Sequence, residues 1–116
     1  MATLWGTPEK LQDLLCELVG WKSLTLTDGE VEFAYKLKDK LMELPYFQEH
    51  PDYIGLGEVN WERQNVTALY KHPEAVDTIV LISHFDTVHT GEYGDLEPLA
   101  CSPYKLAEAF KLIRDE

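Results

Sequence analysis

The fold is decided by the stretch Thr78-Ile79-Val80-Leu81-Ile82-Ser83-His84-Phe85-Asp86-Thr87-Val88. Its first half is an unbroken apolar run, which is typical of a short β-strand that is buried on both faces. The run then gives way to a histidine and, two residues later, an aspartate. In an open α/β sheet, ligands bind just beyond the carboxyl ends of such strands. We therefore expect a strand over 78–83, with His84 and Asp86 at its carboxyl edge as the place where any chemistry occurs.

Two helices are expected before this strand. Thr7 followed by Pro8 predicts a helix start, and the helix is expected to end at Gly20. Its apolar stripe, which we expect to lie in the core, consists of Leu11, Leu14, Leu15, Leu18 and Val19. Thr27 and Glu30 have the spacing of a capping box, so a second helix is expected to begin there and to stop before Pro45. Its buried face is expected to contain Val31, Ala34, Leu37, Leu41 and Leu44, with Phe33 at one margin.

The remaining elements complete an α/β layer pattern. A weak alternating pattern over 54–59 and a stronger one over 65–70 predict two more strands, and Ser102-Pro103 opens a final amphipathic helix. The predicted fold is α/β, with a small, mostly parallel or mixed sheet of about three strands, two amino-terminal helices and one carboxyl-terminal helix. A sheet of this size has unpaired edges, so we expect that something continues or covers it.

Length and charge exclude several classes of function. The 116 residues are enough for one domain, which we take as 1–116. Ten Lys+Arg against 21 Asp+Glu give a net charge of -11, which repels phosphate, so neither nucleic acid nor an anionic membrane is expected as a partner. The sequence has neither an apolar run of membrane-spanning length nor the start of a signal peptide, and a cytoplasmic location is expected. Cys16 and Cys101 match no metal or redox spacing and are expected to be reduced structural thiols.

The residues alone leave two interpretations of His84. A lone histidine after a strand is more often a hydrogen-bonded structural residue than a metal ligand. Asp86 favours a ligand, because a metal-binding imidazole usually donates its second ring proton to a carboxylate or carbonyl. One imidazole does not hold catalytic zinc, however, since such a site takes at least three protein ligands.

The other candidate ligands are weaker. His50 and His72 lie beside prolines in expected surface connections and are predicted to be solvated, whereas His89 follows the motif closely and its part in a site is left open. The acidic residues of the loops are expected to form a solvated face, namely Asp77, Glu92, Asp95 and Glu97. No nucleophile elbow, phosphate-binding loop or Cys-His pair occurs, which excludes a nucleophilic enzyme.

Several motifs occur in the order of a known family. They are the segments Leu14–Val19, Ser23–Glu30, Phe33-Ala34, Asn65-Val66 and Ser83–Val88. Together they resemble the opening of the di-zinc amidohydrolases and peptidases related to acetylornithine deacetylase. The segments Glu43–Glu49, Leu81–Val88 and Tyr93–Leu96 are similar in particular to a bacterial arginine-utilisation branch of that family.

The resemblance implies a zinc-dependent hydrolase. His84 would bind one of two zinc ions, and Asp86 would accept a hydrogen bond from the His84 ring and orient that ring. Complete members also use a bridging aspartate and a glutamate pair, and they hydrolyse an amide or peptide bond by activating water with the metal. No Asp-Met-Lys-like segment or Glu-Glu pair follows the motif here, and Trp21-Lys22-Ser23 stands where the family has Ile-Pro-Ser.

These departures predict an amino-terminal part of one catalytic domain that is inactive alone. The last helix runs to Glu116 without a glycine or proline stop, which leads to the same expectation. In the complete enzyme, the partner would be a small amide or peptide substrate. The alternative interpretation is a non-catalytic α/β module that associates with another chain, or with itself, through an exposed sheet edge.

Overall fold

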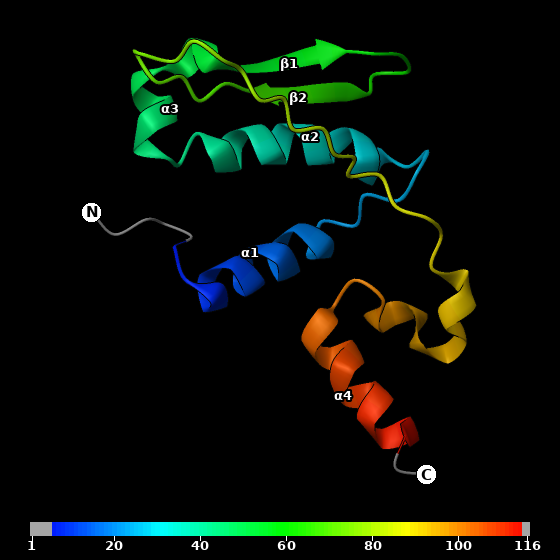
Figure 1. Ribbon diagram of the computed structural model, residues 1–116. Coiled ribbons are helices and arrows are strands. Elements are labelled where there is room, and N and C mark those ends of the chain that lie inside the picture. Colours follow the sequence, from blue (N-terminus) through cyan, green and yellow to red (C-terminus); the bar gives the residue numbers. More distant parts are fainter. Residues whose placement is uncertain (1–5, 115–116) are drawn as a thin grey trace.

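A hairpin of two strands with helix α2 (Asp28–Leu41) packed against it lies along one edge of the molecule, at the top of Figure 1. The computed structural model describes residues 6–114. In chain order, its elements are helices α1 (Pro8–Gly20), α2 (Asp28–Leu41) and α3 (Pro45–Glu49), the 3-10 turn η1 (Pro51–Tyr53), strands β1 (Ile54–Glu58) and β2 (Gln64–Ala68), the 3-10 segment η2 (Gly91–Leu99) and helix α4 (Pro103–Arg114). The predicted α/β class is confirmed.

The helix starts follow local sequence closely. The hydroxyl of Thr7 accepts a hydrogen bond from the Lys10 N–H at 3.3 Å, and Pro8 is the first helical residue, which confirms the predicted start of α1. The capping box at α2 differs from the prediction, because the Glu30 carboxylate accepts the N–H of Leu26 at 2.7 Å and Thr27 makes no side-chain cap. The helix also ends earlier than predicted, at Leu41, and the proline expected to stop it opens α3 instead.

The two strands predicted ahead of residues 78–83 are confirmed, and they pair as an antiparallel hairpin, which the sequence did not predict. Ile54 pairs with Ala68 and Glu58 with Gln64, so β2 ends two residues earlier than predicted. The connecting turn places Trp61 and Glu62 at positive φ, 49° and 64°. Two consecutive positive φ angles are the mark of a type I′ turn, whose twist matches that of the strands it joins. The turn lies near the start of α2 (Figure 1).

The hydrophobic core is small. Its buried apolar side chains are Phe33, Ala34, Phe47 and Ile54. The core therefore lies between α2, α3 and the hairpin. The prediction that the α1 stripe belongs to the core is wrong, since Leu11 is 54% exposed and Leu15 is 61% exposed. The part of the chain that the structure describes does not bury any residue of this helix.

The predicted central strand over 78–83 is also wrong. This segment is an extended stretch without a strand ladder, and Ile79, Leu81 and Ile82 are 87%, 91% and 91% exposed. A strand buried on both faces needs paired neighbours and covering layers, and residues 6–114 supply only the antiparallel hairpin and α2. The predicted parallel sheet is therefore absent from the described chain, apart from one isolated parallel bridge between Leu24 and Thr87.

The overall dimensions agree with this open arrangement. The radius of gyration is 17.4 Å, whereas a compact domain of this length has about 13 Å. The accessible surface is 9293 Å², against about 6,500 Å² for a self-contained protein of the same mass. The chain therefore exposes about 2,800 Å² more than such a domain.

Candidate functional site

The His84–Asp86 segment is held by the loop that joins α1 to α2. The Thr87 N–H donates to the Ser23 carbonyl at 2.9 Å, and the Thr25 N–H donates to the Thr87 carbonyl at 2.9 Å. The hydroxyl of Ser23, which is buried, also donates to the Phe85 carbonyl. We call this set of contacts between residues 23–25 and 85–87 the backbone clip. It gives residues 85–87 a fixed backbone although they belong to no regular strand.

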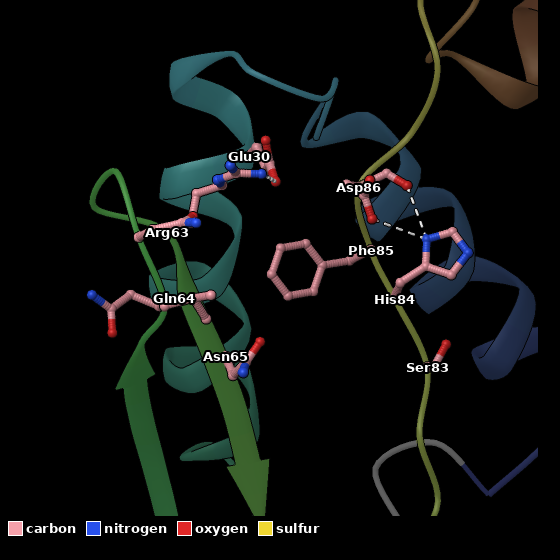
Figure 2. Close-up of a pocket in the computed structure, with 10 residues that line it drawn as sticks. Glu30, Arg63, Gln64, Asn65, Ser83, His84, Phe85 and Asp86 are labelled. Carbon is pink, nitrogen blue, oxygen red and sulfur yellow. Dashed lines mark hydrogen bonds and ion pairs between the residues drawn. The ribbon is translucent and has the colours of Figure 1, made fainter.

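Phe85 anchors the segment to α2. Its ring stacks on the buried ring of Phe33, with centroids 4.6 Å apart and planes at 17°. Trp21 meets Phe33 edge-on at 5.2 Å, so three aromatic rings form one cluster. Successive side chains of an extended backbone point to opposite sides. Figure 2 shows this alternation, with the rings of Phe85 and His84 on opposite sides of the chain.

His84 and Asp86 form a pair, as the family resemblance implies. The ring Nδ1 of His84 lies 3.0 Å from Oδ1 of Asp86 and 3.2 Å from the Asp86 carbonyl oxygen (Figure 2). Both of these oxygens are acceptors, so Nδ1 carries the proton that is shared with them. The other ring nitrogen, Nε2, is thereby left with a lone pair, and the His84 side chain is 85% exposed. In the neutral form of the ring, this geometry turns the nitrogen without a proton toward solvent.

The Asp86 carboxylate is held from a second direction. The Thr25 hydroxyl lies 3.2 Å from Oδ2 of Asp86, while the His84 ring lies against Oδ1. The hydrogen bond from His84, followed by that from Thr25, lowers the pKa of Asp86 below its ordinary value. Both bonds stabilise the charged form, so Asp86 is an ionised acceptor at neutral pH. Sequence reasoning missed Thr25, which is 61 residues away in the chain.

A buried ion pair lies on the Phe85 side of the segment. Glu30 is 7% exposed, and its carboxylate receives the Arg63 guanidinium at 3.3 Å. Arg63 also lies over the Trp61 ring at 4.9 Å from its centroid. Glu30, Arg63 and residues 83–86 are among the residues that line a pocket of about 190 Å³ (Figure 2). Sequence reasoning gave Glu30 only a capping function, because the capping-box spacing does not reveal an arginine 33 residues further on.

The other candidate histidines and thiols are separate from this pair. His50 stacks on Tyr53 with centroids 5.0 Å apart, and His72 accepts the Glu74 N–H at 3.2 Å; both histidines are exposed, as predicted. His89 is also exposed, beyond the clipped segment. The cysteines are free and half-buried.

The acidic loop residues behave as a solvated face. Asp77, Glu92, Asp95 and Glu97 are all exposed, and Glu97 accepts a hydrogen bond from the Thr90 hydroxyl at 3.1 Å. Among residues 6–114, no group of three or more histidine, cysteine, aspartate or glutamate side chains gathers where it could hold a metal ion. A neutral imidazole backed by a carboxylate suits zinc as one ligand. The described residues therefore fit a contribution to a zinc site and do not form a complete one.

Two proteins of Bacillus subtilis (strain 168) are similar to this chain. The uncharacterized protein YqjN is 40% identical over 106 residues, which cover 91% of this chain and 19% of the relative. Protein RocB is 33% identical over 106 residues, which cover 88% of this chain and 19% of the relative. The chain thus spans about a fifth of the length of these curated relatives. The similarity to RocB is therefore distant and confined to about a fifth of that protein.

Two further comparisons add nothing to this relationship. No family model matches the chain, and no solved structure matches it. In the part of the chain that the structure describes, none of the helices combines the length and the apolar character needed to cross a membrane.

Proposed function

We propose that this chain is part of the catalytic domain of a RocB-like zinc-dependent hydrolase that cleaves an amide or peptide bond. In this proposal, His84 is a zinc ligand through Nε2, and Asp86 orients it. The substrate is a small amide or peptide, and the resemblance to the arginine-utilisation branch favours a substrate from arginine catabolism. The chain alone is inactive, because the described residues supply one zinc donor and no glutamate pair.

The observation that carries this proposal is the 3.0 Å contact between Nδ1 of His84 and Oδ1 of Asp86. A carboxylate that accepts the Nδ1 proton fixes the tautomer in which Nε2 is free, and it raises the basicity of that nitrogen. A purely structural histidine would have its ring buried or both nitrogens bonded, whereas the His84 side chain is 85% exposed. The pair is therefore suited to receive a ligand from outside the described chain.

Each group then has one task. Asp86 stays ionised, holds the Nδ1 proton of His84 and limits rotation of the ring. His84 offers Nε2 to the metal. Zinc, when bound, supplies the activation of water for attack on the amide carbonyl. The backbone clip keeps both residues at a fixed distance from α2, to which Phe85 is anchored.

A chimera tests the proposal. The matching 106 residues of Bacillus subtilis RocB are replaced by those of this chain, and zinc content is measured by plasma mass spectrometry alongside amide hydrolysis. His84→Ala is expected to lower the zinc content and to abolish zinc-dependent hydrolysis. His89→Ala is the matched control, because it removes an exposed imidazole five residues later and is expected to leave the zinc content unchanged. A His84→Ala chimera with full zinc and unchanged turnover would refute the assignment.

A second candidate function rests on the exposed apolar run. We propose, as the alternative, a non-catalytic α/β module that associates with another chain through residues 79–82 and the neighbouring sheet edge. These four apolar residues are between 74% and 91% exposed. The surplus surface of about 2,800 Å² on this one chain is at least as large as the roughly 1,000–2,500 Å² per partner that large permanent interfaces bury. An extended segment with unpaired backbone groups is a template for strand addition.

Association is tested by light scattering and sedimentation of the purified chain. The module hypothesis expects a stable dimer, which Leu81→Lys returns to a monomer because it places a charge in the interface. Leu112→Lys is the control, since Leu112 is also exposed, at 72%, but lies on α4. A folded wild-type chain that stays monomeric at high concentration, and forms no complex with a partner chain, would contradict this alternative.

A further inference from the structure

We propose that Thr25 is the positioning residue of the His84–Asp86 pair. Its hydroxyl fixes the Asp86 carboxylate so that the ring proton of His84 stays on Nδ1 and Nε2 remains free to bind a metal. The inference deepens the proposed function and rests on it for the use made of Nε2. The placement of the proton can be tested without any metal.

The carboxylate of Asp86 is held at both oxygens by different partners. Oδ1 faces Nδ1 of His84 at 3.0 Å, and Oδ2 faces the Thr25 hydroxyl at 3.2 Å. A carboxylate bound at one oxygen alone rotates about its terminal torsion, which is broad. Two donors on opposite oxygens restrict that rotation. Thr25 is thus the group that makes the half-buried Asp86 an oriented acceptor.

The Thr25 hydroxyl has one proton and two acceptors within reach. Besides Oδ2 of Asp86, the carbonyl oxygen of Thr87 lies 2.9 Å away. That carbonyl already accepts the backbone N–H of Thr25 at 2.9 Å. A hydrogen bond to an ionised acceptor is roughly twice as strong as a neutral one. The hydroxyl proton is therefore directed to the carboxylate, and the Thr87 carbonyl keeps the backbone donor.

The loop around Thr25 has a backbone conformation that places the Thr25 hydroxyl beside the Asp86 carboxylate. Lys22 and Leu26 have positive φ angles of 55° and 64°, which are costly for residues with a side chain. Between these two residues, the backbone clip joins Thr25 and Ser23 to Thr87 through one backbone hydrogen bond each. Such backbone conformations persist only where the surroundings hold them. The loop thus keeps Thr25 at a set distance from a carboxylate that is 61 residues away.

The first test is the tautomer of His84 in the unaltered 116-residue chain. Long-range ¹H–¹⁵N correlation spectra, recorded at a pH where the imidazole is neutral, report which ring nitrogen carries the proton. The chain has four histidines, and the His84→Gln spectrum identifies the signal. We expect the proton on Nδ1. A wild-type ring protonated mainly on Nε2 would overturn the proposal without any variant of Thr25.

The second test compares variants at Thr25. Thr25→Val removes the hydroxyl at nearly constant volume, and the ratio of the Nδ1–H to the Nε2–H form of His84 is expected to fall about threefold to tenfold, the effect of one lost hydrogen bond. Thr25→Ser keeps the hydroxyl and is expected to keep the wild-type ratio. Thr67→Val is the matched control, since it removes a hydroxyl that lies 3.4 Å from the Gly55 carbonyl oxygen in the hairpin.

The outcomes separate positioning from a structural effect. A merely structural threonine would lower the unfolding midpoint and leave the His84 tautomer unchanged, so a folded Thr25→Val chain with the wild-type ratio would refute the proposal. Where the valine variant does not fold, Thr25→Ala takes its place. If the ratio falls as expected but the His84→Ala chimera keeps its zinc, the positioning stands and the proposed hydrolase function fails.

Discussion

The aromatic cluster under the candidate site gives the sharpest test of the structure. Phe33→Leu keeps an apolar side chain but removes both ring contacts, the stack on Phe85 at 4.6 Å and the edge contact with Trp21 at 5.2 Å. An aromatic pair contributes about 0.5–1.5 kcal/mol beyond the area that it buries. Two such pairs predict a loss of about 1–3 kcal/mol in the free energy of unfolding. The assay is urea denaturation followed by tryptophan fluorescence.

The matched control for this change is Phe110→Leu. Phe110 is 47% exposed on α4, and its ring lies 6.5 Å from that of Tyr93 in a tilted arrangement. We expect a change within about 0.5 kcal/mol, as for other surface substitutions. A double-mutant cycle between Phe33 and Phe85 should give a coupling energy of about 0.5–1.5 kcal/mol. Equal destabilisation by the two leucine variants, or zero coupling, would refute the view that the stack anchors the segment.

Three further results are expected. The His84 hydrogen bond lowers the pKa of Asp86 in the folded state, so ionised Asp86 stabilises the fold above the ordinary aspartate pKa of about 4, and this stabilisation is lost as the pH falls through the lowered pKa. Urea midpoints measured across the acid range should show this pH dependence. Asp86→Asn should remove it. Glu30→Gln loses the buried pair with Arg63 and should cost about 1–3 kcal/mol in urea denaturation, whereas the exposed Glu32→Gln should cost under about 0.5 kcal/mol. Calorimetric titration of the chain alone should show no tight zinc binding, since one imidazole does not make a site; stoichiometric binding would mean that donors discounted here complete one.

Local features of the fold were predictable from the sequence because their partners are close in the chain. The start of α1 depends on Thr7, Pro8 and a backbone N–H three residues on. Strands β1 and β2 depend on local alternation, whereas their antiparallel pairing was not predicted. In both cases the conformation is decided by residues that are close in the sequence. The carboxyl end of α2 was less predictable, because the helix ends at Leu41 and the proline signal only approximates that boundary.

The candidate site was predictable only in part, and for a related reason. His84 and Asp86 are two residues apart, and an extended backbone puts alternate side chains on the same side. Their contact therefore needs no distant partner. Ser23, Thr25 and Arg63 were missed as members of the site region, because their partners lie 62, 61 and 33 residues away and no pattern in the sequence marks such pairs.

The central stretch 78–88 divides into two halves with different surroundings, and this division explains why its first half was wrongly predicted. Residues 85–87 are held within the described chain by the backbone clip and by the stack of Phe85 on the Phe33 ring. Residues 79–82 find neither a paired strand nor a covering layer there, although burying four such side chains is worth about 6–12 kcal/mol. That amount is comparable with the whole stability of a typical domain. Under the proposed function, this apolar run would be a strand that further chain pairs and covers, while its continuation is already held in place by the backbone clip.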